Sequence, residues 1–202
     1  MQLLKDSKPQ RPVKKIGPVV LYVVAFVVAS VAVRGLIGWL NDDKPSSSKL
    51  STSTESKEFV STEYGFKAMF PGLPTTERQN VAVQGYNLTQ TFYSKVIGGD
   101  KYYAIAAIDY PAEFDMSDTK ARLEGALNGS AQNISDGQLL SSSFTKFGTY
   151  DAIDGTITGT QSGEPVTVRA RNILVGQRLY TILVIGVTES EYNSFRDSFQ
   201  LL

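Results

Sequence analysis

The sequence predicts an α+β fold, an antiparallel sheet with two helices packed on its faces (an α/β/α sandwich), preceded by one transmembrane helix. Two observations lead to this prediction. Between residues 58 and 202, strand patterns joined by short turns alternate with two amphipathic helical patterns, an order typical of antiparallel sheets covered by helices. Near the N-terminus, residues 16–40 form an apolar run long enough to cross a bilayer.

The apolar run is IGPVVLYVVAFVVASVAVRGLIGWL, with Arg34 as its only charge. As a helix it would span about 37 Å, more than the roughly 30 Å of a hydrocarbon core. Residues 1–15 carry five basic side chains and one acidic one, and two aspartates follow the run. The positive-inside rule therefore makes residues 1–15 a cytoplasmic tail. The rest of the chain is expected outside a plasma or thylakoid-type membrane, with the lipid bilayer as its first partner.

A cleaved signal peptide is the alternative, because Ser30, Val31 and Ala32 are small residues around a possible cut after Ala32. Apolar residues resume at Leu36, which favours an uncleaved anchor. Both interpretations export the domain. Residues 41–57 are rich in Ser and Thr and predict a flexible linker, on the order of 20 Å from end to end.

Five strand patterns open the domain at residues 58–202. The last of them, KYYAIAAIDY, is apolar on both faces, as expected of a strand in the centre of a covered sheet. It follows its neighbour through the turn Gly98-Gly99-Asp100, a strong hairpin signal. The five patterns span residues 59–61, 66–70, 76–83, 86–96 and 101–110.

A helix follows, with Asp115 as the expected N-cap and an apolar stripe that includes Met116 and runs to Ile134. Four more strands are expected at residues 139–147, 150–160, 166–175 and 179–185. Thr188 and Glu191 then predict a capping box for the last helix. The stripe of that helix is Tyr192, Phe195, Phe199 and Leu202.

The composition excludes several classes of function. The chain has no His and no Cys, so it offers no disulfide, no thiolate nucleophile, no zinc or haem site of the usual kinds and no His-based triad. We therefore predict no cofactor. The exported part is mildly acidic, and because nucleic-acid binding needs a basic surface, DNA and RNA are not expected as partners.

Four carboxylates, Asp109, Glu113, Asp115 and Asp118, crowd one strand-to-helix connection. Oxygen ligands at this density are a candidate Ca²⁺ site, although the spacing of an EF-hand is absent. Further along the chain, Asp151, Asp154 and Gly155 are interpreted as a turn near a strand.

Arg169 and Arg171 share one face of an expected strand, opposite Val168 and Ala170. They are candidate residues for binding an anionic partner. The simpler interpretation is a solvated face of an amphipathic strand.

Three segments resemble PsbP-like domains. They are YGFKAMFPGLP at residues 64–74, RAR with GQRLY at residues 169–180, and FRDSF at residues 195–199. The resemblance spans most of residues 58–202 and implies an α/β/α sandwich and a preference for protein–protein contact. It implies no catalytic residue.

The sequence thus favours a non-enzymatic binding or scaffolding module, anchored in a membrane and facing away from the cytoplasm, with a protein partner. One alternative is a small envelope enzyme or calcium-dependent factor that uses the carboxylates at residues 109–118. Another is an assembly factor that uses the face of Arg169 and Arg171.

Overall fold

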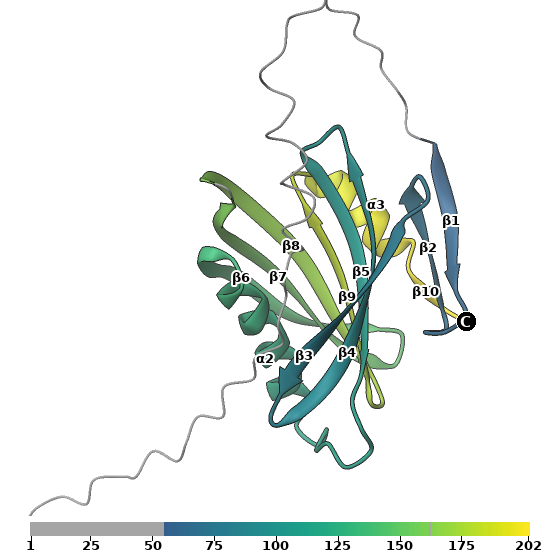
Figure 1. Ribbon diagram of the computed structural model, residues 1–202, viewed down its shortest axis with the longest axis vertical. Coiled ribbons are helices and arrows are strands. Elements are labelled where there is room, and N and C mark those ends of the chain that lie inside the picture. The colour runs from purple at the N-terminus through teal and green to yellow at the C-terminus, as the bar shows by residue number, and fades with distance from the viewer. Residues whose placement is uncertain (1–54, 162) are drawn as a thin grey trace, which may run out of the picture.

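The computed structural model describes residues 55–161 and 163–202, which form two antiparallel sheets and two helices (Figure 1). A seven-stranded sheet has the order β3-β4-β5-β9-β8-β7-β6, and a three-stranded sheet has the order β1-β2-β10. The helices are α2 (Thr119–Gln132) and α3 (Glu189–Asp197). The strands are β1 Ser56–Ser61, β2 Phe66–Pro71, β3 Thr75–Val83, β4 Tyr86–Ile97, β5 Lys101–Asp109, β6 Ser135–Phe147, β7 Tyr150–Gln161, β8 Glu164–Val175, β9 Arg178–Ile185 and β10 Gln200–Leu201.

The large sheet is built from two sets of hairpins. Strands β3 to β5 pair in sequence order, and so do β6 to β9. The sets join where β5 pairs with β9, for example at Ile105 and Ile182. Gly98 and Gly99 have φ angles of 62° and 88°, which glycine adopts without strain, so they reverse the chain from β4 into β5. The predicted antiparallel α+β fold is confirmed.

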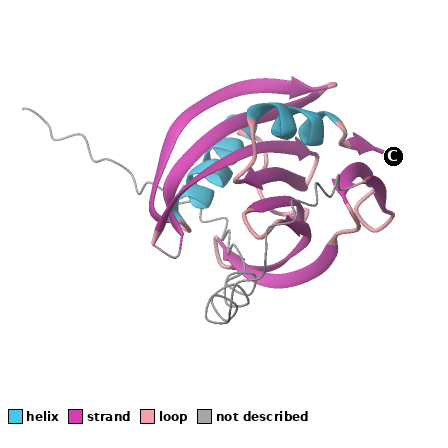
Figure 2. Ribbon diagram, turned by 90° about the horizontal axis from the view of Figure 1, so that it is seen from above, coloured by secondary structure: helices cyan, strands magenta, loops and turns pink. Residues whose placement is uncertain are grey.

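Each face of the large sheet has its own hydrophobic core. Helix α2 packs on β6, β7 and β8, while α3 packs on β9 and on β2 of the small sheet. Strand β5 contributes to both cores, with Ala106 and Ile108 on the α2 side and Ile105 and Ala107 on the α3 side. This confirms the prediction that its sequence belongs in the centre of the sheet. Figure 2 shows the large sheet as a curved layer with the C-terminal strand beside it.

The small sheet was not foreseen, because all strands were expected in one sheet. Its β2 turns Phe66 and Phe70 into the α3-side core, where both are fully buried. Phe66 stacks on Phe199 with 5.3 Å between ring centroids, and Phe70 meets Phe195 edge-on at 5.0 Å. Aromatic pairs of this kind stabilise a core beyond the area they bury. They tie the two ends of the domain together.

Helix α2 begins later than predicted. Its N-cap is Asp118, whose carboxylate accepts a hydrogen bond from the Ala121 amide at 3.0 Å. Asp115 instead accepts from the Ser117 amide at 2.8 Å, in the turn before the helix. The expected cap at Asp115 is therefore wrong, because two aspartates three residues apart both fit the cap pattern. Met116 lies outside the helix, although it still packs against the α2-side core.

The last helix has the predicted capping box of Thr188 and Glu191. It ends at Asp197, so Phe199 and Leu202 do not belong to its stripe. Phe199 is buried beyond the helix end, whereas Leu202 is exposed. The interpretation of Asp154 as a turn is also wrong, since Asp154 lies within β7. The following Gly155 packs against α2 so closely that a Cβ there would approach the Leu127 methyl groups to 2.5 Å.

The predicted cytoplasmic tail 1–15, the transmembrane segment 16–40 and linker residues 41–54 lie outside the described residues. The last two predicted linker residues belong to β1, where Ser56 and Lys57 pair with β2. In residues 55–161 and 163–202, neither helix has the length and apolar character that a bilayer span requires.

Candidate functional site

A polar cleft of about 350 Å³ opens beside α3 on the large sheet. We call it the α3 cleft. It exists because α3 packs on β9 and β2, so the same face of β6, β7 and β8 has no helix over it. Those three strands form the floor of the cleft, and α3 forms its wall.

Two cross-strand rows make the floor. Residues directly opposite each other on neighbouring strands point to the same face of a sheet. The outer members of both rows are serines, whose short side chains leave the hollow open on the side of β6. The rows are Ser141–Thr156–Arg169 and Ser143–Asp154–Arg171.

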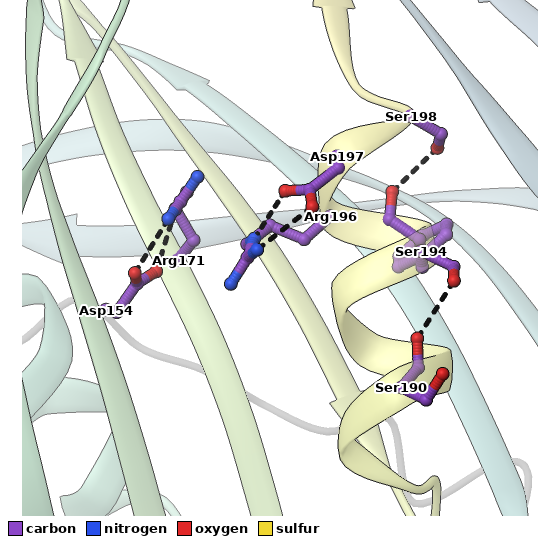
Figure 3. Close-up of polar contacts among 8 residues, drawn as sticks. Asp154, Arg171, Ser190, Ser194, Arg196, Asp197 and Ser198 are labelled. Carbon is purple, nitrogen blue, oxygen red and sulfur yellow. Dashed lines mark hydrogen bonds and ion pairs between the residues drawn. The ribbon is translucent and has the colours of Figure 1, made fainter.

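Arg171 and Asp154 form a two-pronged ion pair in the second row, with both N–O distances at 2.7 Å (Figure 3). The Arg171 side chain is only 13% exposed. Its expected position on a solvated strand face is therefore wrong, because α3 comes to lie beside that strand. The pair neutralises both charges, so Arg171 holds Asp154 in place and is not itself available to an anionic partner.

Arg169, in the other row, has a different environment. Its guanidinium Nη1 donates to the backbone carbonyl of Val187 at 3.0 Å. Within the described residues no carboxylate lies at salt-bridge distance from it. The bond to Val187, just before α3, fixes the side chain at the cleft and leaves its guanidinium without a salt bridge, although Glu189 lines the same cleft. Of the two predicted arginines, Arg169 is the one able to bind an anionic group.

The wall is positioned by the N-terminal cap of α3. Glu191 accepts from the Thr188 amide at 2.8 Å and from Lys101 Nζ at 2.6 Å. These bonds, that of Lys101 first, lower the pKa of Glu191 to about 2. Because the cap fixes the start of the helix, it also fixes which α3 residues face the cleft.

Arg196 stands one turn after Tyr192 on that wall. It forms a two-pronged pair with Asp197, at 2.7 and 3.0 Å (Figure 3), and this pair lowers the pKa of Asp197. Its guanidinium carbon also lies 5.3 Å from the Tyr192 ring centroid, within range of a cation–π contact. Arg196 therefore packs against the ring of Tyr192.

Tyr192 is the unusual residue of the site. Its side chain is buried, with 6% of the residue exposed. Its hydroxyl has no hydrogen-bond partner among the described residues. Burial, followed by the charge of Asp154, raises its pKa against the smaller opposing effects of Arg171 and Arg196, so the phenol stays protonated at physiological pH. Arg196 is close enough to favour the ionised phenol, but as a cation it cannot accept the phenol proton. Because a buried hydroxyl without a partner is destabilising, an acceptor supplied by a ligand would complete this site.

The α3 cleft thus presents several hydrogen-bond donors, and among them Arg169 has no salt bridge in the described residues. Arginine stays protonated at any physiological pH, and the Tyr192 phenol does so here as well. Such donors bind acceptors such as carboxylates and carbonyls, while the carboxylates of Asp154 and Glu189 also line the cleft.

Three of the four candidate metal ligands have separate structural contacts, and the fourth is exposed. Asp109 at the end of β5 pairs with Arg178, Asp115 holds its own turn, Asp118 caps α2, and Glu113 is exposed. Across the described parts of the chain, no three carboxylates come close enough to hold a metal ion together.

Sequence reasoning missed three residues of the cleft: Asp154, Tyr192 and Arg196. Tyr192 was correctly expected on the apolar stripe of the last helix, but its unpartnered hydroxyl has no sequence signal. The alternation of β8 did place Arg169 and Arg171 on one face. Only the packing of α3 distinguishes their roles.

Comparisons with known proteins find similarity in structure but not in sequence. No family model and no curated protein matches the chain. Cyanobacterial PsbP (CyanoP) of Synechocystis sp. PCC 6803 superposes with a TM-score of 0.52 at 12% identity, covering 78% of this chain and 98% of that one. At this identity the likeness concerns the fold alone.

Two further solved structures are more distant. LpqN, described as involved in cell envelope biogenesis of Mycobacterium tuberculosis, has a TM-score of 0.41 at 13% identity, covering 71% of this chain and 84% of its own. A protein of unknown function from Pseudomonas aeruginosa, described as a putative regulator, has a TM-score of 0.37 at 11% identity, covering 68% and 86%. It is the superposition on CyanoP that shows a PsbP-like α+β fold for the described domain.

Proposed function

We propose that this chain is a non-enzymatic binding module, anchored by residues 16–40 in a plasma or thylakoid-type membrane, and that its α3 cleft binds an acidic group of a protein partner outside the cytoplasm. The observation that carries the proposal is the buried Tyr192 hydroxyl without a partner. Tyr192 lines a polar cleft together with Arg169, which has no salt bridge in the described residues.

The chemistry of the cleft supports an acidic protein group over a small apolar ligand. Arg169, Asn193 and Tyr192 line the cleft, and the side chain of each carries an N–H or O–H donor. A carboxylate has two oxygens and accepts bonds from several donors at once. Charge-assisted bonds of this kind are roughly twice as strong as neutral ones. The fold supports the proposal only in general terms, since one fold hosts many functions.

The anchor is supported by the apolar run and by the basic residues before it. A tether formed by residues 41–55 would hold the domain close to the membrane yet let the cleft turn toward a partner. A reporter fused after Leu202 tests this orientation. The proposal requires that the reporter be reached from outside the cell and that the chain remain in the membrane fraction.

Photo-crosslinking from the cleft tests the binding site. A photoreactive amino acid at Asn193 on α3 is expected to capture a protein partner in intact membranes. The matched control is Asn128, an exposed asparagine on α2, which covers the opposite face of the sheet. Capture from Asn193 but not from Asn128 supports the proposal, and equal yields from the two sites contradict it.

Substitution of Arg169 tests the chemistry of the capture. Arg169→Gln should lower the yield from Asn193 about tenfold, because a charge-assisted hydrogen bond contributes roughly 1.5–3 kcal/mol. Arg169→Lys keeps the charge and should retain most of the yield. Equal losses in both variants would mean that Arg169 acts only by holding the Val187 carbonyl.

A further inference from the structure

Strand β6 forms one edge of the large sheet. It is 13 residues long, and most of its side chains are exposed. In the part of the chain that the structure describes, no strand pairs with its outer side. An edge of this length displays a row of unpaired backbone N–H and C=O groups, which is a template for another strand.

Most exposed edges carry charged residues that keep other strands away. The opposite edge of this sheet follows that rule, because β3 has Glu77 and Arg78 in its exposed middle. On β6, residues 137–145 carry no charge. Two large apolar side chains are exposed there, Leu140 at 69% and Phe144 at 42%.

We propose that β6 pairs antiparallel with β6 of a second copy of this chain, so that two large sheets become one continuous sheet. A two-fold contact places the residues near its centre against themselves, and Ser141, Ser142 and Ser143 at the centre of β6 are small and uncharged. Leu140 is the extra residue of a register shift between Leu139 and Ser141, so Leu139 and Phe144 lie equally far from Ser142. Pairing about Ser142 therefore sets Leu139 of one copy against Phe144 of the other, a favourable cross-strand pair, with the exposed Leu140 beside it.

Charge complementarity selects a second copy and the antiparallel direction. Asp136 stands near the start of β6 and Lys146 near its end. In an antiparallel pair, Asp136 of each copy lies near Lys146 of the other, whereas a parallel pair would set like charges side by side. Opposite charges across strands are stabilising, and like charges are destabilising.

The geometry also suits two chains in one membrane. The two-fold axis of such a pair runs perpendicular to the sheet, so both α3 faces lie on the same side. The small sheet covers this face through β2, and Ser56 begins its strand β1 (Figure 1). Both linkers therefore leave from one side of the dimer. The two α3 clefts, each open toward β6, become neighbours across the seam.

Cysteine scanning tests the pairing directly, because the chain has no Cys of its own. Single variants S141C, S142C and S143C of the full-length chain are reconstituted into vesicles at a low ratio of protein to lipid and oxidised with copper phenanthroline. Opposite residues in an antiparallel pair have Cα atoms about 4.5–5.5 Å apart, which suits a disulfide. A cysteine that lies one position away from the centre of the pair opposes a different residue of the partner. Its own counterpart then lies two positions further along the partner strand, too far away for a disulfide.

One of the three variants is therefore expected to cross-link to a dimer in at least about fivefold higher yield than the matched control T76C on the opposite edge. If position 141 or 143 links best, S142K is added to that variant; if position 142 links best, S142K alone is tested by sedimentation. In either case S142K should weaken the dimer about fivefold, since like charges then oppose each other. The melting temperature of each variant checks that it folds.

Yields no higher than that of T76C, or equal yields at all three positions, overturn the proposal, because the first means no pairing and the second means random collision. Cross-links to a different protein in native membranes would also overturn it, by naming another occupant for the edge. A dimer whose stability is unchanged by S142K would also overturn the proposal.

Discussion

Substituting Tyr192 by Phe is the most direct test of the α3 cleft. Removing a buried hydroxyl from a tyrosine usually destabilises a protein, because a hydrogen bond of about 1 kcal/mol is lost. Here the sign is expected to reverse. The Tyr192 hydroxyl is buried and has no partner in the described parts of the chain, so the folded state lacks a bond that water provides in the unfolded state.

The magnitude follows from the same observation. A buried polar group without a partner costs about 1–3 kcal/mol. The phenylalanine keeps the ring, its burial and its contact with Arg196 at 5.3 Å. Tyr192→Phe should therefore stabilise the free protein by about 1 kcal/mol, the low end of that range, because the cleft is open enough to relax. For a domain of this size, this raises the melting temperature by about 3 °C.

The assay is thermal unfolding of the full-length chain in detergent micelles, followed by circular dichroism. Tyr180→Phe is the matched control, because the Tyr180 hydroxyl is also buried but donates to the Tyr64 carbonyl. That variant should be less stable by about 1 kcal/mol. If Tyr192→Phe proves as destabilising as Tyr180→Phe, the hydroxyl has an acceptor in the free protein, and the reasoning that assigns it to a ligand fails.

Three further predictions concern stability. The folded pKa of Glu191 is lowered from 4.5 to about 2, chiefly by Lys101, so its contribution is present above pH 4.5 and is lost as the pH falls toward 2. The shift corresponds to at most about 3 kcal/mol, which solvent screening of a 35% exposed side chain reduces to about 1. Denaturant titrations should show Glu191→Gln losing this amount at pH 7 and not at pH 2. Asp118→Ala should lower the free energy of unfolding by about 1 kcal/mol through loss of the α2 cap, and Asp115→Ala by less than about 0.5 kcal/mol. Equal losses in the two variants would contradict the assignment of Asp118 alone as the cap. Leu127→Ala, at a fully buried position, should lower the urea midpoint by the equivalent of about 3 kcal/mol, and a loss below about 1 would contradict the packing of α2 on β7.

Most of the elements were predictable because their signals are local. The Gly98-Gly99 turn, the two-sided apolar pattern of β5 and the capping box at Thr188 each depend on a few adjacent residues. Boundaries were less predictable where two residues fit one role, as Asp115 and Asp118 did for the cap of α2. The division into two sheets was not predictable, because the pairing of β10 with β2 joins residues more than 130 positions apart.

The candidate site was predictable only in part. Strand alternation places Arg169 and Arg171 on one face, since that requires only a period of two. It does not reveal that Arg171 forms a salt bridge with Asp154 while Arg169 bonds to a backbone carbonyl instead. Those roles depend on β7 lying beside β8 and on the distance from α3, and neither is encoded in a short stretch of the chain.

The sequence alone determined the α+β class, the order of strands and helices and the expectation of an N-terminal anchor, because hydrophobic periodicity and turn residues act over a few positions. Only the tertiary structure decided that α3 covers β9 and leaves β6, β7 and β8 to floor a cleft. It also decided that the Tyr192 hydroxyl has no partner in the described chain. Whether a buried group is satisfied depends on every segment that packs around it, and these segments come from distant parts of the sequence.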